Sequence, residues 1–222
     1  MDWPALWLSL RLGALTVLVL LPIGIACGRW LAHRRFPGKG LVEAAVALPL
    51  VLPPTVLGYY LLVGFGAGSP LGGLWQDLFG QPLVFTFEGL LVASVIVNLP
   101  FAIQPMQRGF EAIPRELREA AASCGMSPWR VLRRIELPLA WPGILTAMVL
   151  SFAHTLGEFG VVLMVGGSIP GETRTIAIAI YDRVQAFDDA AAGRMAALLL
   201  AISLATIAGS YALSSRVGRR LV

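Results

Sequence analysis

The chain has 222 residues, of which 57% are hydrophobic and 14% are charged, and its mean hydropathy is +0.76. Soluble globular chains carry about 25% charged residues, so this composition excludes an ordinary soluble domain and indicates a surface that largely faces lipid. The formal net charge is +4, and the placement of the basic residues is more informative than their sum. Two cysteines, Cys27 in an apolar run and Cys124 in a polar one, predict neither a disulfide nor a cysteine metal cluster.

The N-terminal apolar run predicts a retained membrane helix. It lacks the short basic start and the small-residue cleavage site of a secretory signal, and it is longer than a signal core. A spanning helix needs about 20 mostly apolar residues. Five stretches meet this requirement, and they cover residues 12–31, 42–63, 84–106, 144–165 and 195–213.

Glycines and prolines modify these spans. Gly24 and Gly28 in the first stretch are small enough to let neighbouring helices approach closely. Prolines interrupt the second and third stretches, at Pro49, Pro53, Pro54, Pro100 and Pro105. Each proline removes a backbone donor and kinks a helix, which membrane helices tolerate where neighbours or cavity water satisfy the freed carbonyls. Two interpretations stay open, namely ordinary helix packing or broken helices that line a pathway, with Pro53 and Pro54 as pathway candidates.

Two further segments are not predicted to cross the membrane. Residues 64–82 are rich in glycine and proline and predict an irregular connection. Residues 176–181 are apolar but too short to span, so they are predicted to be re-entrant or interfacial. No repeat, linker or low-complexity tract appears, and the sequence therefore predicts a single transmembrane domain over residues 1–222.

A polar hairpin separates the third and fourth apolar stretches. Pro114 suits the first position of a helix, and residues 115–123 are rich in strong helix formers. Gly125 supplies the left-handed conformation with which many helices end. Ser127 then caps a second helix that starts at Pro128 and is expected to end near the membrane, at the Leu-Pro pair that closes the hairpin.

Seven positions of this hairpin follow a spaced pattern: Glu-Ala-Ala, three residues, Gly, nine residues, Ile, one residue, Leu-Pro. The residues at these positions are Glu119, Ala120, Ala121, Gly125, Ile135, Leu137 and Pro138. The pattern resembles the cytoplasmic EAA loop through which permeases of ABC importers contact their ATPase subunits. The resemblance implies that these seven residues couple the chain to an ATPase. Without the pattern, the hairpin would predict an amphipathic loop lying on anionic lipid.

The basic residues predict the orientation, because Lys and Arg are enriched on the cytoplasmic side of membrane proteins. With the N-terminus outside, thirteen of the seventeen fall in cytoplasmic segments. These are Arg29, Arg34, Arg35, Lys39, Arg108, Arg115, Arg118, Arg130, Arg133, Arg134, Arg216, Arg219 and Arg220. The hairpin and the C-terminus are therefore predicted to lie in the cytoplasm.

His154 and Glu158 stand out inside the fourth apolar stretch. A charge at the bilayer centre costs about 2.5–3.5 kcal/mol on insertion scales, so such residues usually face a bundle interior or a water path. Four residues apart, the two side chains share a helical face and are expected to interact. We interpret them as gate or pathway candidates, with a structural role for Glu158 favoured over contact with cargo. They supply two possible metal ligands where catalytic zinc needs three, so no metal site is predicted.

No nucleotide site is predicted in this chain. A phosphate loop requires Gly, four residues, Gly-Lys and then Ser or Thr. The nearest candidate, Gly38-Lys39-Gly40, lacks the first glycine and the hydroxyl. ATP and its Mg²⁺ are therefore expected on a partner protein.

Three stretches extend the resemblance over most of the chain. LPLVLPPTVLGYYLL at 48–62, LGEFG at 156–160 and SIPGETRTIAIAIY at 168–181 are similar to permease subunits of molybdate ABC importers. Sulfate permeases share a stretch like LGEFG, whereas IPGETRT is more typical of the molybdate branch. The chain departs from the commonest family pattern at His154, where many members carry arginine.

The resemblance implies an all-α integral membrane fold. The expected architecture is a type I ABC-importer (MetI-like) transmembrane domain, with about five spanning helices and a cytoplasmic coupling-helix hairpin at about residues 108–141. It also implies a non-catalytic subunit without a cofactor of its own, in the inner membrane of a prokaryote. The implied partners are a second permease copy, two ABC ATPase subunits and an extracytoplasmic oxyanion-binding protein, with no nucleic acid.

Molybdate or tungstate is the expected cargo, and sulfate is the alternative. Arg174, Arg183 and Arg194 lie on the predicted outer side, where they would attract an anion. Several acids crowd the same region, namely Glu172, Asp182, Asp188 and Asp189. Charge alone therefore does not identify the cargo, because contact with a binding protein explains a mixed pattern equally well.

Two other classes of function remain as alternatives. An ion-driven secondary transporter would show inverted repeats and paired midplane charges, whereas this chain shows one midplane acid and no repeat. An intramembrane enzyme built on His154 and Glu158 would lack a nucleophile and a third ligand.

Overall fold

The computed structural model describes residues 1–218, whose regular secondary structure is helical. Four helical stretches are long and apolar enough to cross a membrane, namely Trp3–His33, Phe87–Glu111, Pro128–Gly157 and Asp189–Ser210. A fifth crossing results if the bent pair Lys39–Val51 and Pro54–Phe65 is one span. The prediction of an all-α membrane fold with about five spans is confirmed.

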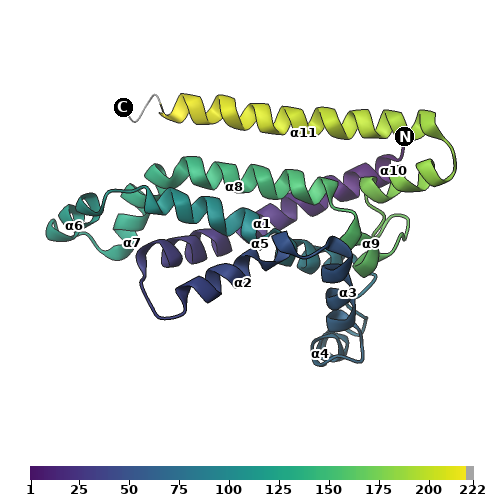
Figure 1. Ribbon diagram of the computed structural model, residues 1–222, viewed down its shortest axis with the longest axis horizontal. Coiled ribbons are helices and arrows are strands. Elements are labelled where there is room, and N and C mark those ends of the chain that lie inside the picture. Colours follow the sequence, from purple (N-terminus) through teal and green to yellow (C-terminus); the bar gives the residue numbers. More distant parts are fainter. Residues whose placement is uncertain (219–222) are drawn as a thin grey trace.

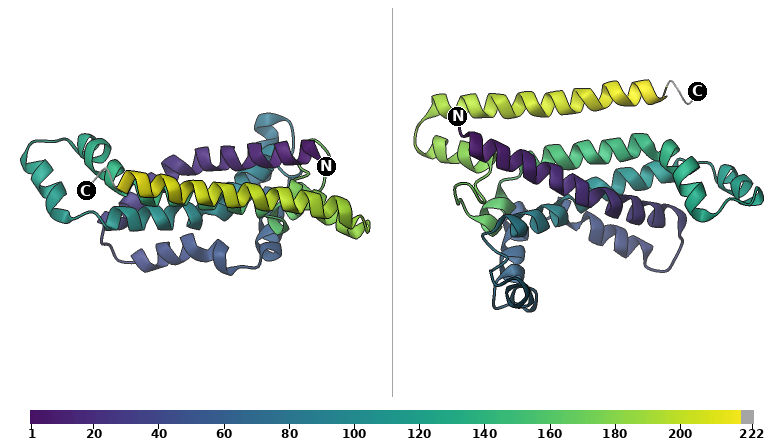
Figure 2. Two further views of the ribbon diagram at one scale, coloured as in Figure 1. Left: turned by 90° about the horizontal axis from the view of Figure 1, so that it is seen from above. Right: turned by 180° about the vertical axis from the view of Figure 1, so that it is seen from behind.

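The long helices run along the long axis of the molecule and carry a helical hairpin at one end (Figure 1). The bundle consists of α1 (Trp3–His33), α5 (Phe87–Glu111), α8 (Leu137–Gly157) and α11 (Asp189–Gly218). The hairpin contains α6 (Arg115–Ser123) and α7 (Pro128–Val131). It lies opposite the N-terminus, and α11 runs back toward it along the edge of the bundle (Figure 2). We call the two ends of the bundle the hairpin end and the N-terminal end.

Glycines set the distance between α1 and α5. A Cβ atom built at Gly28 would lie 2.9 Å from the backbone nitrogen of Gln107, and one at Gly24 would lie 2.7 Å from the sulfur of Met106. A larger side chain at Gly28 would force the helices apart, whereas one at Gly24 would displace the end of the Met106 side chain, so the predicted close approach is confirmed. Met106 itself is buried in a cluster with Phe110 and Ile144, which joins α5 to α8.

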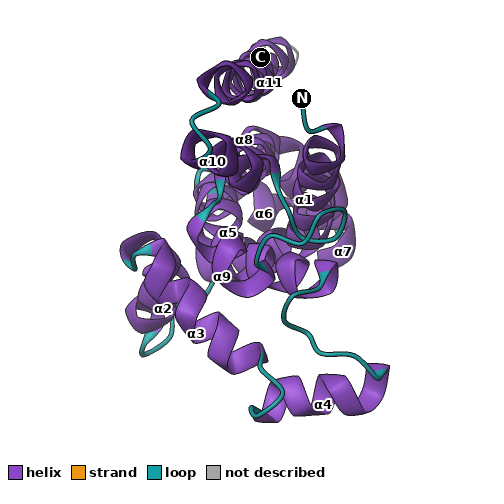
Figure 3. Ribbon diagram, turned by 90° about the vertical axis from the view of Figure 1, so that its right-hand side faces the viewer, coloured by secondary structure: helices purple, strands orange, loops and turns teal. Residues whose placement is uncertain are grey.

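The second predicted span is bent sharply. α2 (Lys39–Val51) and α3 (Pro54–Phe65) meet at an angle of 108°. A residue that precedes proline is pushed out of the helical region, and both Leu52 and Pro53 precede one. Both are extended, with ψ of 136°. The two consecutive prolines therefore break the helix, and α2, α3 and α4 form an arm beside the central helices (Figure 3).

The segment 64–82 is not wholly irregular, contrary to the prediction, because it contains α4 (Pro70–Phe79). Ser69 caps this helix by accepting a hydrogen bond from the backbone N–H of Gly72 at 2.9 Å. Gly80 ends it in the left-handed conformation, with φ of 72°. These local stop and start signals outweigh the high glycine content, which lowers helix propensity but does not abolish it.

The fourth predicted span, 144–165, is shifted in the structure. α8 begins at Leu137 and ends at Gly157, and Glu158 and Phe159 interrupt the helix before the short α9 (Gly160–Gly166). Apolar composition continues through the break, so a hydropathy window does not detect it. The helical stretch instead extends toward the hairpin and starts at Pro128.

The short apolar segment 176–181 forms part of α10 (Ile176–Gln185), which does not cross the bundle. Ile176, Ile178 and Ala179 are buried, and α10 packs mainly on α11. Ser9 of α1 fixes its start, since its hydroxyl oxygen accepts a hydrogen bond from the N–H of Ile176 at 2.8 Å. α10 therefore closes the N-terminal end of the bundle.

The helix packing predicts that alanine substitutions at two glycines have opposite effects on thermal stability. Alanine normally stabilises a helix interior by about 1 kcal/mol relative to glycine. At Gly28 this gain should be outweighed by the clash with backbone of α5, so Gly28→Ala should lower the midpoint of thermal unfolding in detergent. Gly40→Ala, in α2 with no atom within 4 Å of the added Cβ, should leave it unchanged or raise it. Equal midpoints for the two variants would contradict the proposed close packing.

Candidate functional site

The first arm of the hairpin has the predicted boundaries. α6 runs from Arg115 to Ser123, and Pro114 precedes it as the N-cap rather than as its first residue. Gly125 adopts a φ of 73°, and its N–H donates to the carbonyl of Ala122 at 2.9 Å. The N–H of Met126 donates to the carbonyl of Ala121 at 3.1 Å. This pair of bonds is the Schellman arrangement that ends many helices, so the predicted glycine turn is confirmed.

The second arm starts as predicted but does not end as predicted. Ser127 caps α7, with its Oγ accepting a hydrogen bond from the N–H of Arg130 at 3.4 Å, and Pro128 is the first helical residue. The expected end at Leu137 and Pro138 is wrong. A π turn, η1 (Leu132–Glu136), leads without interruption into α8. The wider turn lies directly before Pro138, where the missing proline N–H and the ring would otherwise disturb a regular helix.

The seven motif positions divide into a tip and a base. At the tip, Glu119, Ala120 and Gly125 are exposed, while Ala121 is only 6% exposed. At the base, Ile135 and Leu137 are half-buried and Pro138 is exposed. Glu119 accepts a hydrogen bond from Nε of Arg115 at 2.8 Å. The tip thus presents a nearly smooth alanine surface beside one ion pair.

Two large apolar side chains on the hairpin were not predicted as functional. Leu117 is 45% exposed on α6 and Trp129 is 68% exposed on α7. Exposed aromatic residues on a polar hairpin are typical of contact surfaces. Their signal in the sequence was the presence of Leu and Trp in a stretch whose other residues are mostly charged or small.

A buried ion pair anchors the base of the hairpin, and it too was not predicted. Glu136 lies between Ile135 and Leu137, at a position that the motif leaves unspecified, and its side chain is 1% exposed. Its Oε2 lies 2.5 Å from Nε of Arg29, and its Oε1 lies 3.7 Å from Nδ1 of His33. Both partners belong to the end of α1. The only signal in the sequence was an acid at the edge of an apolar stretch, on the same predicted side as these two residues.

Glu158 lies at a helix break and not inside a spanning helix. Its Oε1 accepts a hydrogen bond from the N–H of Val161 at 2.9 Å, so the carboxylate caps the start of α9. Its Oε2 lies 3.8 Å from Nε2 of His154, which confirms the predicted contact between the two. The His154 ring in turn stacks on Phe101 of α5, with 4.3 Å between ring centroids. The carboxylate is therefore engaged by the protein itself.

The structure brings the two helix breaks together. A Cβ built at Gly160 would lie 2.8 Å from Cβ of Pro54, and one built at Gly58 would lie 2.9 Å from Cβ of Met164. α3 and α9 consequently pack along each other. Pro54 thus lies next to the break that contains Glu158, and Pro53 lies at the corner before it; both prolines are exposed.

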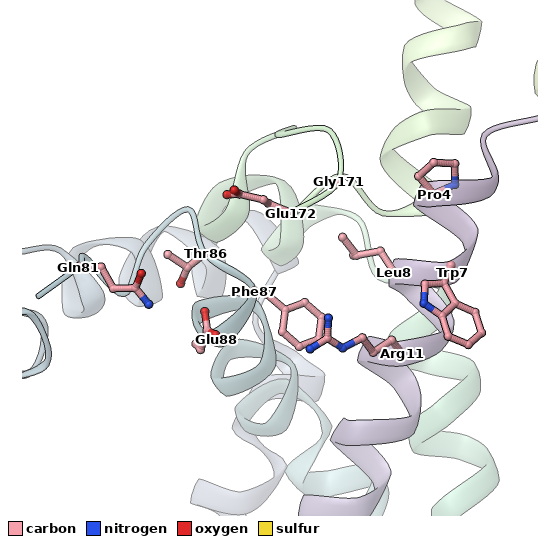
Figure 4. Close-up of a pocket in the computed structure, with 10 residues that line it drawn as sticks. All are labelled: Pro4, Trp7, Leu8, Arg11, Gln81, Thr86, Phe87, Glu88, Gly171 and Glu172. Carbon is pink, nitrogen blue, oxygen red and sulfur yellow. The ribbon is translucent and has the colours of Figure 1, made fainter. Parts of the chain in front are cut away.

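A cavity of about 430 Å³ opens at the N-terminal end, between α1, the start of α5 and the loop before α10 (Figure 4). Arg11 lines this cavity, and its guanidinium lies over the ring of Phe87, 4.4 Å from the ring centroid. Glu88 and Glu172 also line the cavity. One cation between two acids does not favour an anion, so this cavity is not an obvious oxyanion site.

The other arginines of this end are mostly neutralised. Arg174 pairs with Asp182 at 2.9 Å and with Asp2 at 3.7 Å, and Arg183 pairs with Asp188 at 3.5 Å. These contacts tie the loop after α9 to α1 and α10. The predicted attraction of an anion by Arg174 and Arg183 is therefore weak, because each guanidinium already faces a carboxylate.

The fold and the site define a class of multi-pass helical membrane protein that carries a polar hairpin at one end. The chain belongs to the family of binding-protein-dependent transport system inner membrane components, which it matches over residues 21–219. The molybdenum transport system permease protein ModB of Azotobacter vinelandii is 48% identical over 210 residues, which cover 95% of this chain and 93% of that protein.

A second relative and a solved structure are also similar to this chain. The sulfate transport system permease protein CysT of Escherichia coli (strain K12) is 34% identical over 87% of this chain and 70% of that protein. An inward-facing structure of the MetNI methionine ABC transporter matches with a TM-score of 0.75 and 18% identity, over 98% of this chain and 96% of that chain. At this identity the match shows the fold, and it confirms the predicted MetI-like architecture.

Family membership confirms several expectations. The chain is a multi-pass inner membrane protein and a non-catalytic component of an ABC transporter, and such components bind no cofactor of their own. A binding-protein-dependent system implies an ATPase and a binding protein as partners.

The buried ion pair predicts a strong effect of Glu136→Gln. Breaking a fully buried pair costs about 3–5 kcal/mol, and the cost here should be smaller because Arg29 is 33% exposed and can recover water. The midpoint of thermal unfolding of the purified protein should be clearly lower for this variant. It should be unchanged for Glu116→Gln, because Glu116 is an exposed residue of α6. The double variant Arg29→Gln/Glu136→Gln should lose less stability than the sum of the losses of the two single variants. Additive losses would show that the two residues do not interact.

Proposed function

We propose that this chain is the permease subunit of an ATP-driven importer, in which two copies form the path for molybdate across the membrane. The observation that carries this proposal is the helical hairpin closed by the turn at Gly125, which presents the tip of the EAA pattern to solvent. The name of the A. vinelandii relative supports molybdenum as the transported element. Tungstate, a similar oxyanion, remains part of the proposal, and sulfate is the alternative because of the likeness to CysT.

The proposed orientation places the hairpin end in the cytoplasm and the N-terminus outside. Of the seventeen basic residues, those of the hairpin and of the loop after α1 gather at the hairpin end. This asymmetry agrees with the enrichment of basic residues on the cytoplasmic side. The cavity beside Arg11 then faces outward, where a binding protein docks.

A second copy of the chain would complete the path. No residue of α2 is fully buried within one copy. Large apolar side chains on α2 and α3, including Leu48, Val51, Tyr59 and Tyr60, are exposed. If a second copy covered this arm, the bent α2–α3 pairs of the two copies would enclose a space between them. The single domain over residues 1–222 would then be half of the transport path.

Coupling and gating are proposed to occur at opposite ends of one helical stretch. Glu119, Ala120, Ala121, Gly125, Ile135, Leu137 and Pro138 form the part that docks on the ATPase. The stretch Pro128–Gly157 has 30 residues and so spans about 45 Å at 1.5 Å per residue. At its far end, His154 and Glu158 hold the break that lies beside Pro54, and Pro53 marks the adjacent corner. Movement of the hairpin would therefore displace the break that forms the proposed gate.

Gly125→Val tests the docking role. Valine is strongly disfavoured at positive φ, so the variant should deform the hairpin tip, reduce co-purification of the ATPase and reduce uptake of molybdate. Gly38→Val is a matched control, because Gly38 also has a positive φ, of 84°, and no atom within 4 Å of its Cβ position. The control should keep ATPase association. Normal association and uptake in Gly125→Val would contradict the docking role of the hairpin.

Competition for uptake tests the cargo. Cells that lack this chain should lose accumulation of molybdate at trace concentration and regain it when the chain is restored. Tungstate should compete with molybdate at similar concentration, whereas sulfate should need a large excess. Equal competition by sulfate would favour the sulfate alternative, and uptake without any ATPase would contradict an ATP-driven importer.

A further inference from the structure

The structure contains a second polar cavity, at the hairpin end. It measures about 630 Å³ and lies between the end of α1 and α6. The side chains that line it are basic except for two alanines and one glutamate: Ala32, His33, Arg34, Arg35, Arg115, Arg118, Glu119 and Ala122. Two segments that are far apart in the sequence thus place four guanidinium groups around one space.

Within the described part of the chain, the positive charge of this cavity is not balanced. The one carboxylate among the side chains that line it, that of Glu119, is bound by Arg115. The neighbouring carboxylate of Glu136 is bound by Arg29, and it also lies 3.7 Å from Nδ1 of His33. Among residues 1–218, Arg34, Arg35 and Arg118 form no ion pair in the structure. Like charges that converge in this way repel one another unless an anion lies between them.

Arg118 also carries a buried donor without an acceptor. Its Nε is shielded from solvent and has no hydrogen-bond partner within the described part of the chain. A buried donor that is left unpaired costs free energy, and the cost is larger when the donor is charged. An acceptor oxygen supplied from outside the chain would remove this cost.

The number and type of the free donors favour a tetrahedral oxyanion group. A guanidinium presents a planar fork that binds phosphate oxygens in pairs. Three free guanidiniums around one cavity match a group with several oxygens better than a planar carboxylate with two.

Trp30 and Phe36 also pack together at this end, with 4.6 Å between their ring centroids, and Trp30 is 46% exposed. Such exposed aromatic residues are typical of the membrane interface, which places the cavity within reach of lipid headgroups.

We propose that the cavity between α1 and α6 binds a phosphate-type oxyanion group, either the headgroup phosphate of an acidic lipid or a free anion. The bound group would bridge Arg34 and Arg35 to Arg118. It would thereby hold the first arm of the hairpin against the end of the first spanning helix. This site is distinct from the transport path and does not depend on the identity of the cargo.

Binding to the purified full chain, with any ATPase that co-purifies, tests the proposal. Phosphatidylglycerol and phosphatidylcholine are added in detergent, and retained lipid is counted by native mass spectrometry. In a parallel arm, inorganic phosphate is titrated by calorimetry against a chloride control of equal ionic strength. Retention of phosphatidylglycerol alone identifies the lipid as the source, whereas saturable binding of phosphate identifies a free anion. Binding of neither would overturn the proposal.

Charge-removing variants locate the site. Arg118→Gln should weaken the observed binding about tenfold or more, as loss of a charged hydrogen bond implies. Arg34→Gln, in the loop after α1, should act in the same direction and serves as the second variant should Arg118→Gln not fold. Arg108→Gln is the matched control, because Arg108 is exposed, pairs with Glu111 at 3.0 Å and does not line the cavity.

The control variant distinguishes a specific site from general attraction of anions to a basic surface. The proposal is overturned if Arg108→Gln loses as much affinity as the two cavity variants, since binding would then reflect overall charge. It is also overturned if cross-linking shows that carboxylates of the ATPase fill the cavity in the assembled transporter. Neither result would bear on the transport of molybdate, because no uptake is measured.

Discussion

The ion pair between Arg29 and Glu136 is the contact on which the geometry of the hairpin depends. A carboxylate that is 1% exposed is stable in its charged form only when it is paired. Its partner lies on α1, 107 residues earlier in the chain. The pair therefore ties the start of α8 to the end of the first spanning helix, next to the base of the hairpin.

The helix breaks at the other end are stabilised by different means. In lipid, each backbone group that a break frees must find a partner inside the protein. At the corner before α3, the two prolines have no N–H to satisfy. At the end of α8, the carboxylate of Glu158 accepts the N–H of Val161. The acid thus has a structural task that explains its presence in an apolar segment without any contact to cargo.

The parts of the fold that depend on neighbouring residues were predictable, and the parts that depend on distant ones were not. The run 115–123 matches α6 because the helix formers and the turn at Gly125 are adjacent. Ser69 offered a similar signal for α4, but the glycine-rich composition obscured it. Glu136 could not be assigned, because its partner is far away in the sequence. The break at Glu158 was missed because hydropathy measures composition, and composition does not change there.

The position of the anchor along the helical stretch has a mechanical consequence. On one side of Glu136, the residues from Pro128 onward form a short arm of nine residues, or about 14 Å. On the other side, α8 forms a long arm of 21 residues, or about 32 Å. If Glu136 is the pivot, a displacement at the hairpin is enlarged about twofold at the break beside Pro54. With the charged anchor at this position, a movement of the hairpin would be larger at the far end of the bundle than at the hairpin itself.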